Sequence, residues 1–230
     1  MTKARDTANL TGSGVTLPLL DIDAGTDIGA ALVDADLMIV DDGAGGTNRK
    51  ATMSRLATYM GTKIGGGMEF ITSTGAISNA ASADFTGFDS SKYDHYVFYF
   101  QHVIPATDDK LLLGRIAVSG TSYDATNGNY HSSSNTDRTG LVVADNVGSD
   151  SNEFGVSGKY HLFSPHTAAY TYGASETLYI KSDGVLYARE SLGDGRSVHL
   201  NAAAVTAIQF LYDSGNIESG EITMFGIVNS

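Results

Sequence analysis

Two polar stretches of the chain, 119–138 and 164–175, carry the side chains best suited to bind a ligand. Carbohydrate-binding surfaces combine flat aromatic rings with hydroxyl and amide groups, usually on loops that a rigid scaffold positions. The candidate ligand-binding residues in these stretches are Tyr123, Asn127, Asn129, Tyr130, His131, His166, Tyr170 and Tyr172. The alternative is that the tyrosines pack the loops down or fill a contact between subunits.

No other pattern supports a metal site, a cofactor or a catalytic group, so we expect a protein that is not an enzyme. Asp21, Asp23 and Asp27 are spaced as in a calcium loop, but the closing glutamate is missing. His95 and His102 have opposite parity on one predicted strand and cannot jointly face a metal by simple alternation. A pair of carboxylates acting on a sugar stays open, since the chain has 26 acidic residues.

The charge of the chain disfavours nucleic acid as a partner. The formal net charge is -12, and residues 66–230 hold 18 of the 26 acidic side chains but only 8 of the 14 basic ones. A phosphate backbone requires the opposite sign. The sequence has no cysteine, and no apolar stretch predicts a signal peptide or membrane insertion. Its 27 glycines and 3 prolines are typical of a β protein with glycine turns.

The elements that must position the candidate residues are β-strands. In the C-terminal stretch 205–228, Ile208, Phe210 and Tyr212 share one strand face, and a polar turn separates them from Ile222 and Met224. We expect a hairpin there. Its second strand is apolar on both faces, which predicts a central position in a large antiparallel domain.

Other strands follow the same alternation. The longest is expected at 93–104, and it too is apolar on both faces. A more specific prediction concerns the loop of the hairpin around Ser182, Asp183 and Gly184. Pairing Ile180 with Leu186 leaves these three residues as the loop, a turn that ends on a left-handed glycine.

The chain is expected to have two domains joined at a glycine linker, 65–67. Residues 1–65 would form an extended arm and a small ββα module, whose helix opens at Ser54 and stops at Gly61. About thirty residues cannot bury enough surface alone, so this module should dock on another copy or another protein. Residues 66–230 would form an antiparallel β-sandwich.

Several segments resemble tailed-bacteriophage fibre and tail-fibre-like structural proteins. The C-terminal likeness rests on the residues numbered 68–72, 83–89, 93–98, 104–108 and 205–210, and most specifically on Ser-Gly-Asn-Ile-Glu-Ser-Gly-Glu-Ile-Thr-Met-Phe-Gly-Ile at 214–227. Residues 36–42 and 50–57 are similar to adaptor segments of phage structural proteins. The resemblance implies a jelly-roll-like sandwich, a homotrimer and a place on the virion, and it carries over no ligand-binding residues.

We therefore expect a virion structural protein, a short fibre or spike, assembled in the host cytoplasm. Residues 1–65 would bind other virion proteins, and residues 66–230 would face outward to recognise a host-surface receptor, expected to be a glycan. One alternative is a capsid decoration, head-fibre or cement protein without a receptor role. Another is a polysaccharide depolymerase, which the missing catalytic pattern and the missing β-helix repeats disfavour.

Overall fold

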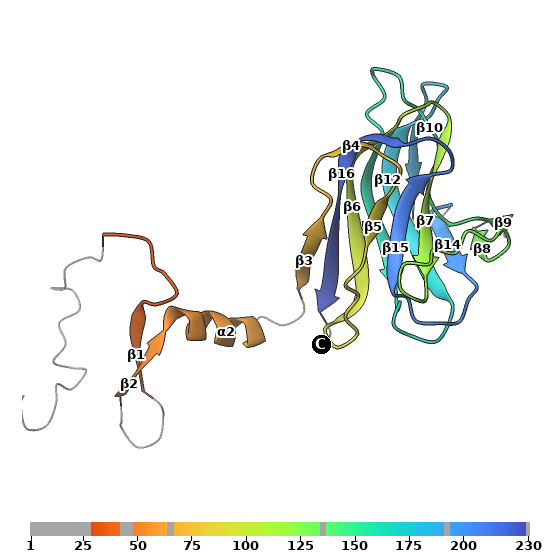
Figure 1. Ribbon diagram of the computed structural model, residues 1–230. Coiled ribbons are helices and arrows are strands. Elements are labelled where there is room, and N and C mark those ends of the chain that lie inside the picture. The colour runs from red at the N-terminus through yellow and green to blue at the C-terminus, as the bar shows by residue number, and fades with distance from the viewer. Residues whose placement is uncertain (1–28, 42–47, 64–66, 134–136, 191–193, 229–230) are drawn as a thin grey trace, which may run out of the picture. The chain divides into compact units, whose positions relative to one another are not determined.

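The computed structural model describes residues 29–41, 48–63, 67–133, 137–190 and 194–228. The chain divides into two compact units, Met1–Lys63 and Ile64–Ser230 (Figure 1). This division falls two residues before the domain boundary expected at 65. The predicted N-terminal arm and the three aspartates at 21, 23 and 27 lie outside the described residues.

Among its described residues, the first unit contains one strand pair and one helix. Strand β1 (Leu37–Asp41) pairs antiparallel with β2 (Asn48–Thr52), and α2 (Met53–Lys63) follows directly. The helix continues through Gly61, so the predicted stop at this residue is wrong. An exposed glycine weakens a helix by only about 1 kcal/mol, which the surrounding turns can offset.

The second unit is built from two antiparallel sheets (Figure 1). The small sheet has the strand order β10-β7-β15-β5, and the large sheet has the order β3-β16-β6-β11-β12-β14-β8-β9, with β4 paired to β16 and β13 to β12. The bounds of these strands are β3 Met68–Ser73, β4 Ile77–Ala80, β5 Ala83–Phe85, β6 Tyr93–Pro105, β7 Lys110–Ala117, β8 Tyr130–Ser132, β9 Asp137–Arg138, β10 Leu141–Val147, β11 Val156–Phe163, β12 Thr171–Ile180, β13 Leu186–Arg189, β14 Arg196–His199, β15 Ala207–Tyr212 and β16 Ile217–Val228.

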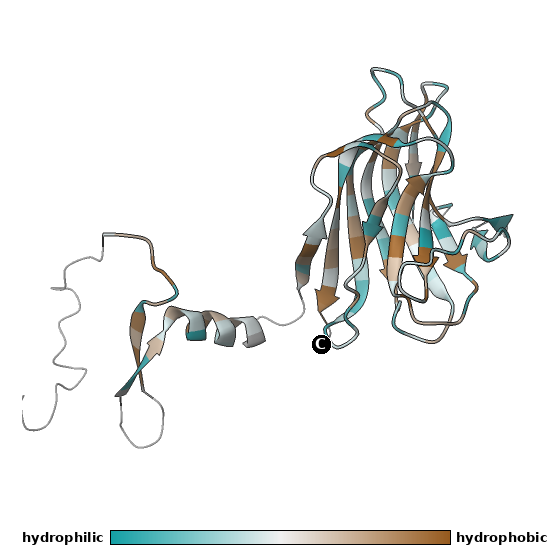
Figure 2. Ribbon diagram, viewed as in Figure 1, coloured by the Kyte–Doolittle hydropathy of each residue, from teal (hydrophilic) through white to brown (hydrophobic). Residues whose placement is uncertain are grey.

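The core lies between the two sheets, as expected of a β-sandwich. Phe98 of the large sheet contacts Phe210 of the small sheet edge to face, with ring centroids 4.9 Å apart. Phe85 completes the cluster at 5.3 Å from Phe98. Apolar residues follow the strands of both sheets (Figure 2). The mainly β, antiparallel fold predicted from the sequence is therefore confirmed.

The predicted C-terminal hairpin is wrong, because β15 and β16 belong to different sheets. Phe210 of β15 and Met224 of β16 are both fully buried and belong to one core cluster, to which they contribute from different sheets. The hydroxyl of Tyr212 joins the two layers by donating to Val103 O at 2.7 Å. The prediction of a central C-terminal strand is confirmed, since β16 pairs with β6 on one side and with β3 and β4 on the other.

The three-residue loop at 182–184 is confirmed. Ile180 pairs with Leu186, and Gly184 has the left-handed φ of 77°. The face shared by Leu178 and Leu186 is half-exposed or more. It points away from the core, so this hairpin displays its apolar residues on the outer face of the large sheet.

Both stretches predicted to be long loops contain strand residues. Strands β8 and β9 lie within 119–138, and β12 begins at Thr171, inside 164–175. Strand β14 supplies the pairing partner, since it lies between β8 and β12. These pairings are distant in sequence, and local patterns do not reveal them.

Candidate functional site

Tyr130 is a core residue, although the sequence placed it on a binding loop. Its side chain is fully buried. Its hydroxyl accepts a hydrogen bond from Ile116 N at 3.0 Å and donates one to Asp124 O at 2.9 Å. Burial raises the pKa of this phenol well above its ordinary value. The ring therefore has no surface for a ligand, and its role is to fix the segment that follows β7.

Asn129 also stabilises this segment from within. Its Nδ2 donates to Asp124 Oδ2 at 2.7 Å, and the same carboxylate oxygen lies 3.1 Å from His199 Nε2. Burial raises the pKa of Asp124, but hydrogen bonds from Thr126, Asn129 and His199 outweigh it and lower the pKa to about 2. Asp124 is consequently an ionised anchor of the loop at neutral pH.

Tyr123 and Asn127 differ in exposure. Tyr123 is half-buried, with its hydroxyl covered, and its backbone bridges to Ala117. Burial raises the pKa of its phenol. Asn127 is exposed, in the turn closed by Asn129 N donating to Thr126 O at 3.2 Å. Of the five candidate residues in the first predicted loop, only Asn127 and the strand residue His131 present their side chains toward solvent or the outer sheet face.

His166, in the second stretch, is a structural contact. Its Nε2 lies 3.0 Å from the Tyr96 hydroxyl, which in turn accepts a hydrogen bond from Asp89 N at 2.6 Å. Burial lowers the pKa of His166. Its ring packs near Phe88 and Tyr96. The histidine thus ties the 164–170 segment to the sandwich, and it is only partly accessible to a ligand.

Tyr170 and Tyr172 are exposed, by 47% and 55% respectively. Tyr172 pairs with Phe163 of β11, and Phe163 pairs with His95 of β6. Since directly paired residues share a sheet face, these three rings stand side by side on the outer face of the large sheet. The centroids of His95 and Phe163 are 5.5 Å apart.

We call the set of paired residues that crosses the large sheet here the aromatic row. It runs over six adjacent strands, a length of about 24 Å at the usual strand spacing. Its members, in order, are Ile227, His95, Phe163, Tyr172, Val198 and His131. The structure therefore places two of the predicted site residues, His131 and Tyr172, in one row, with Val198 between them.

A second aromatic plane lies beside the row. The ring of His161 stacks on Phe163 at a centroid distance of 5.7 Å and an interplanar angle of 10°. Burial lowers the pKa of His95 and of His161. Both imidazoles are therefore mainly uncharged at neutral pH, and they extend the flat apolar surface of Phe163. Sequence reasoning missed His95, His161 and Phe163 because their proximity depends on the pairing of β6 with β11.

Polar groups lie at the His131 end of the aromatic row and, four residues farther along, on two of its strands. His131 Nε2 lies 3.2 Å from Asp137 Oδ1 at one end. Lys159 and Glu176, on the two strands that carry Phe163 and Tyr172, form an ion pair at 2.9 Å. Flat rings next to donors and acceptors have the chemical character of a carbohydrate-binding surface.

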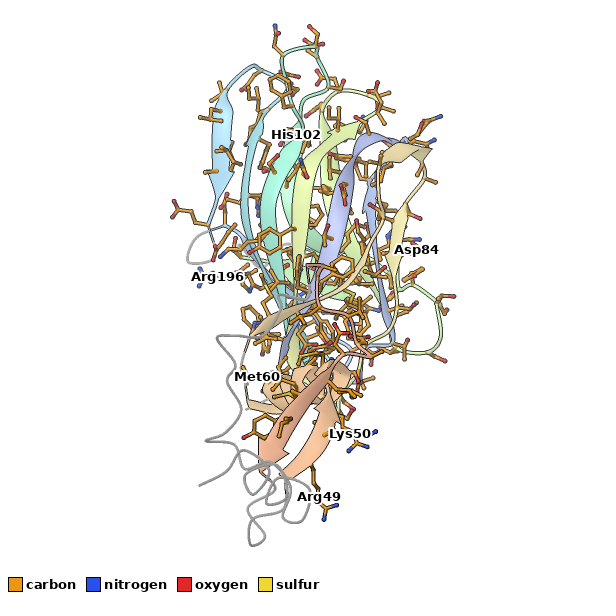
Figure 3. The ribbon with its side chains drawn as sticks, turned by 90° about the vertical axis from the view of Figure 1, so that its left-hand side faces the viewer. Arg49, Lys50, Met60, Asp84, His102 and Arg196 are labelled. Carbon is orange, nitrogen blue, oxygen red and sulfur yellow. The ribbon has the colours of Figure 1, made fainter. Side chains whose placement is uncertain are left out.

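His102 differs from its prediction. A β-bulge interrupts the pairing of β6 with β11 between Val156 and Gly158, and His102 has a φ of 48°. The extra residue shifts the alternation of side chains by one position. His102 therefore faces outward, on the same side of the large sheet as His95 (Figure 3). There it borders an apolar pocket of about 280 Å3 with Phe154, Leu178 and Leu186.

Within the described ranges, no three His, Asp or Glu side chains converge as a metal site would require. Among the same residues, no helix is both long and apolar enough to cross a bilayer. Comparison with known proteins gives no further guide, since no family model, curated protein or solved structure matches the chain. The candidate site therefore rests on the geometry of the aromatic row.

Proposed function

We propose that this chain is a structural protein of a tailed-bacteriophage virion, a short fibre or spike whose sandwich, jelly-roll-like as the resemblance implies, recognises a host-surface glycan through the aromatic row. It would be assembled in the host cytoplasm and carried on the virion. Residues 1–65 would anchor it as a small ββα module behind an extended arm, and residues 66–230 would be displayed outward.

The exposed rings of the aromatic row are the observation that carries this proposal. Phe163 and Tyr172 are 39% and 55% exposed, yet they lie on β11 and β12, inner strands of the large sheet. Strands paired on both sides hold their side chains in fixed positions, so the rings are preorganised for a flat ligand. Exposed aromatic groups of this kind on a soluble domain usually mark an interaction site.

The anchoring role is supported by the apolar surface of the first unit. Leu37 and Ile39, on one face of β1, are 59% and 57% exposed. Met60 of α2 is also exposed, by 44%. The described residues of this unit leave these side chains exposed, so another virion protein or another copy would cover them.

A homotrimer is part of the proposal. Phe70 of β3 is 62% exposed and packs edge to face on Phe225, which also contacts Tyr99. This cluster lies on β3, β16 and β6, beside the Ile227 and His95 end of the aromatic row, whereas Tyr172 lies on β12, two strands farther from the β3 edge than β6. Contact between copies at Phe70 would cover it and leave Tyr172 accessible. The threefold order comes from the resemblance alone.

A capsid decoration or cement protein is the second candidate. The same exposed residues, Phe70 and Leu37 among them, favour it, because a cement protein needs apolar surfaces that bind neighbouring subunits. The two candidates differ in the expected effect of Tyr172→Ala. A receptor-binding protein loses attachment with this change, whereas a cement protein keeps its function.

An array printed with bacterial surface polysaccharides tests the proposal. The wild-type chain should bind at least one polysaccharide, and Tyr172→Ala should weaken that binding by about tenfold, since an aromatic stacking contact contributes about 1 kcal/mol or more. Tyr59→Ala, an exposed tyrosine of α2 outside the sandwich, is the control and should bind as the wild type does. Equal binding by a folded Tyr172→Ala protein would remove the aromatic row from the receptor site.

A further inference from the structure

A polar pocket of about 170 Å3 lies on the inner side of the large sheet, near the strands that carry the His131 end of the aromatic row. Its lining includes Arg138 of β9, Asp145 of β10, Arg189 at the end of β13 and Asp194. Arg189 pairs with the buried residue Thr177, so its side chain points to the inner side of the large sheet. Two guanidinium groups and two carboxylates thus meet in one small space.

Arg189 is the central group of this pocket, and its side chain is only 6% exposed. Its Nη1 lies 3.0 Å from Asp145 Oδ1, and its Nη2 donates to Asp194 O. Its Nε is buried without a hydrogen-bond partner in the described part of the chain. A buried charged donor without an acceptor is costly, so this N–H is suited to an acceptor that enters the pocket.

Arg138 repeats the pattern from the neighbouring side. Its Nη1 donates to Asp137 O at 3.2 Å, whereas its Nε is buried and has no acceptor among the described residues. Ser133, which also lines the pocket, donates through its hydroxyl to Asp194 O at 3.4 Å. Two unpartnered N–H groups from separate strands therefore border the same space.

The carboxylates supply the complementary acceptors and are held in place. The phenol of Tyr179 donates to Asp145 Oδ1, and Lys181 Nζ lies 3.7 Å from Asp145 Oδ2. The phenol of Tyr187 donates to Asp194 Oδ2. Burial raises the pKa of Asp145, but Tyr179, Arg189 and Lys181 outweigh it and lower the pKa. The two guanidinium groups and the two carboxylic side chains of the lining balance in formal charge, so the pocket offers donors and acceptors together to a neutral ligand.

We propose that this pocket is a binding subsite for one neutral sugar ring. A sugar hydroxyl accepts a hydrogen bond and donates another, so adjacent hydroxyls can pair with a guanidinium N–H and a carboxylate oxygen together. The volume of about 170 Å3 is below the 300–1,000 Å3 of drug-sized sites, which restricts the occupant to one ring. The proposal goes beyond the function proposed above, because it depends only on the donors and acceptors of this pocket.

Saturation-transfer NMR on the full-length chain tests the subsite. The probes are the methyl glycosides of glucose, galactose, mannose and N-acetylglucosamine, with acetate as the anion probe. We expect transfer to at least one glycoside, and binding weakened about tenfold or more in Arg138→Gln and Arg189→Gln, because each change removes a charged hydrogen-bond donor. Arg55→Gln, an exposed arginine of α2, is the matched control and should bind as the wild type does.

The outcomes separate this subsite from the aromatic row. If Arg189→Gln does not fold, Arg138→Gln decides, since Arg138 is less buried. Glycoside binding lost in Arg138→Gln but kept in Tyr172→Ala supports the pocket, whatever becomes of the row. The reverse result overturns the pocket and leaves the function proposed for the row standing. Binding of acetate in place of every glycoside, or of no probe at all, also overturns the proposal.

Discussion

Replacing Tyr130 by phenylalanine tests whether this residue belongs to the core or to a binding surface. The change removes only the hydroxyl oxygen, which is fully buried and joins Ile116 N to Asp124 O. The backbone N–H of Ile116 then remains buried without its acceptor, at a cost of about 1–3 kcal/mol. The lost bond to Asp124 O adds about 1 kcal/mol, so we expect Tyr130→Phe to lower the free energy of unfolding by about 2–4 kcal/mol.

Urea unfolding measures this change, followed by tyrosine fluorescence and by far-ultraviolet circular dichroism, since the chain has no tryptophan. Tyr170→Phe is the control, because Tyr170 is 47% exposed and its loss of a hydroxyl should alter the free energy by no more than about 0.5 kcal/mol. If both variants unfold at the wild-type urea concentration with an unchanged m-value, Tyr130 is not the buried connection described here.

Three further predictions address packing, pH dependence and assembly. Gly173→Ala should destabilise the chain by about 1–3 kcal/mol in the same urea assay, because a Cβ there would overlap the hydroxyl of buried Tyr160. Gly61→Ala is the control: a Cβ there has nothing within 4 Å, so this change should raise the helix content seen by circular dichroism. The pKa of the Asp124 carboxyl falls from 3.8 to about 2 on folding. The stability that this carboxylate contributes is therefore complete above pH 3.8 and is lost as the pH falls through 2. Asp124→Asn should flatten the acid-unfolding curve between these two pH values. Light scattering should give three times the chain mass of 24.1 kDa, and Phe70→Glu should lower it to one chain, while a wild-type monomer would contradict the trimer.

The parts of the fold that the sequence predicted depend on local patterns. Alternation along 93–104 places Phe98 and Phe100 in the core because period two is a property of any strand. The loop ending at Gly184 follows from pairing Ile180 with Leu186, only a few residues apart. In the same way, the C-terminal strand is apolar on both faces, and this pattern predicted the central position that β16 has in the large sheet.

The remaining features depend on which distant strands become neighbours. The apolar alternation around Phe210 and around Met224 fits a hairpin and two facing sheets equally well. Only the packing of the core decides between the two arrangements. Tyr130 lies on a three-residue strand, too short for its parity to be read. The aromatic row needs β6, β11 and β12 in order, a result of pairings that the residues near Phe163 do not encode.

Competition for adsorption is the measurement that tests the proposed function most directly. Purified chain is added to host cells before the virions that carry it, and attached virions are counted. Wild-type protein should block attachment, and a folded Phe163→Ala/Tyr172→Ala double variant should not, because it lacks two exposed rings of the aromatic row. Attachment unaffected by the wild-type protein, or blocked equally by the double variant, would contradict glycan recognition by this face.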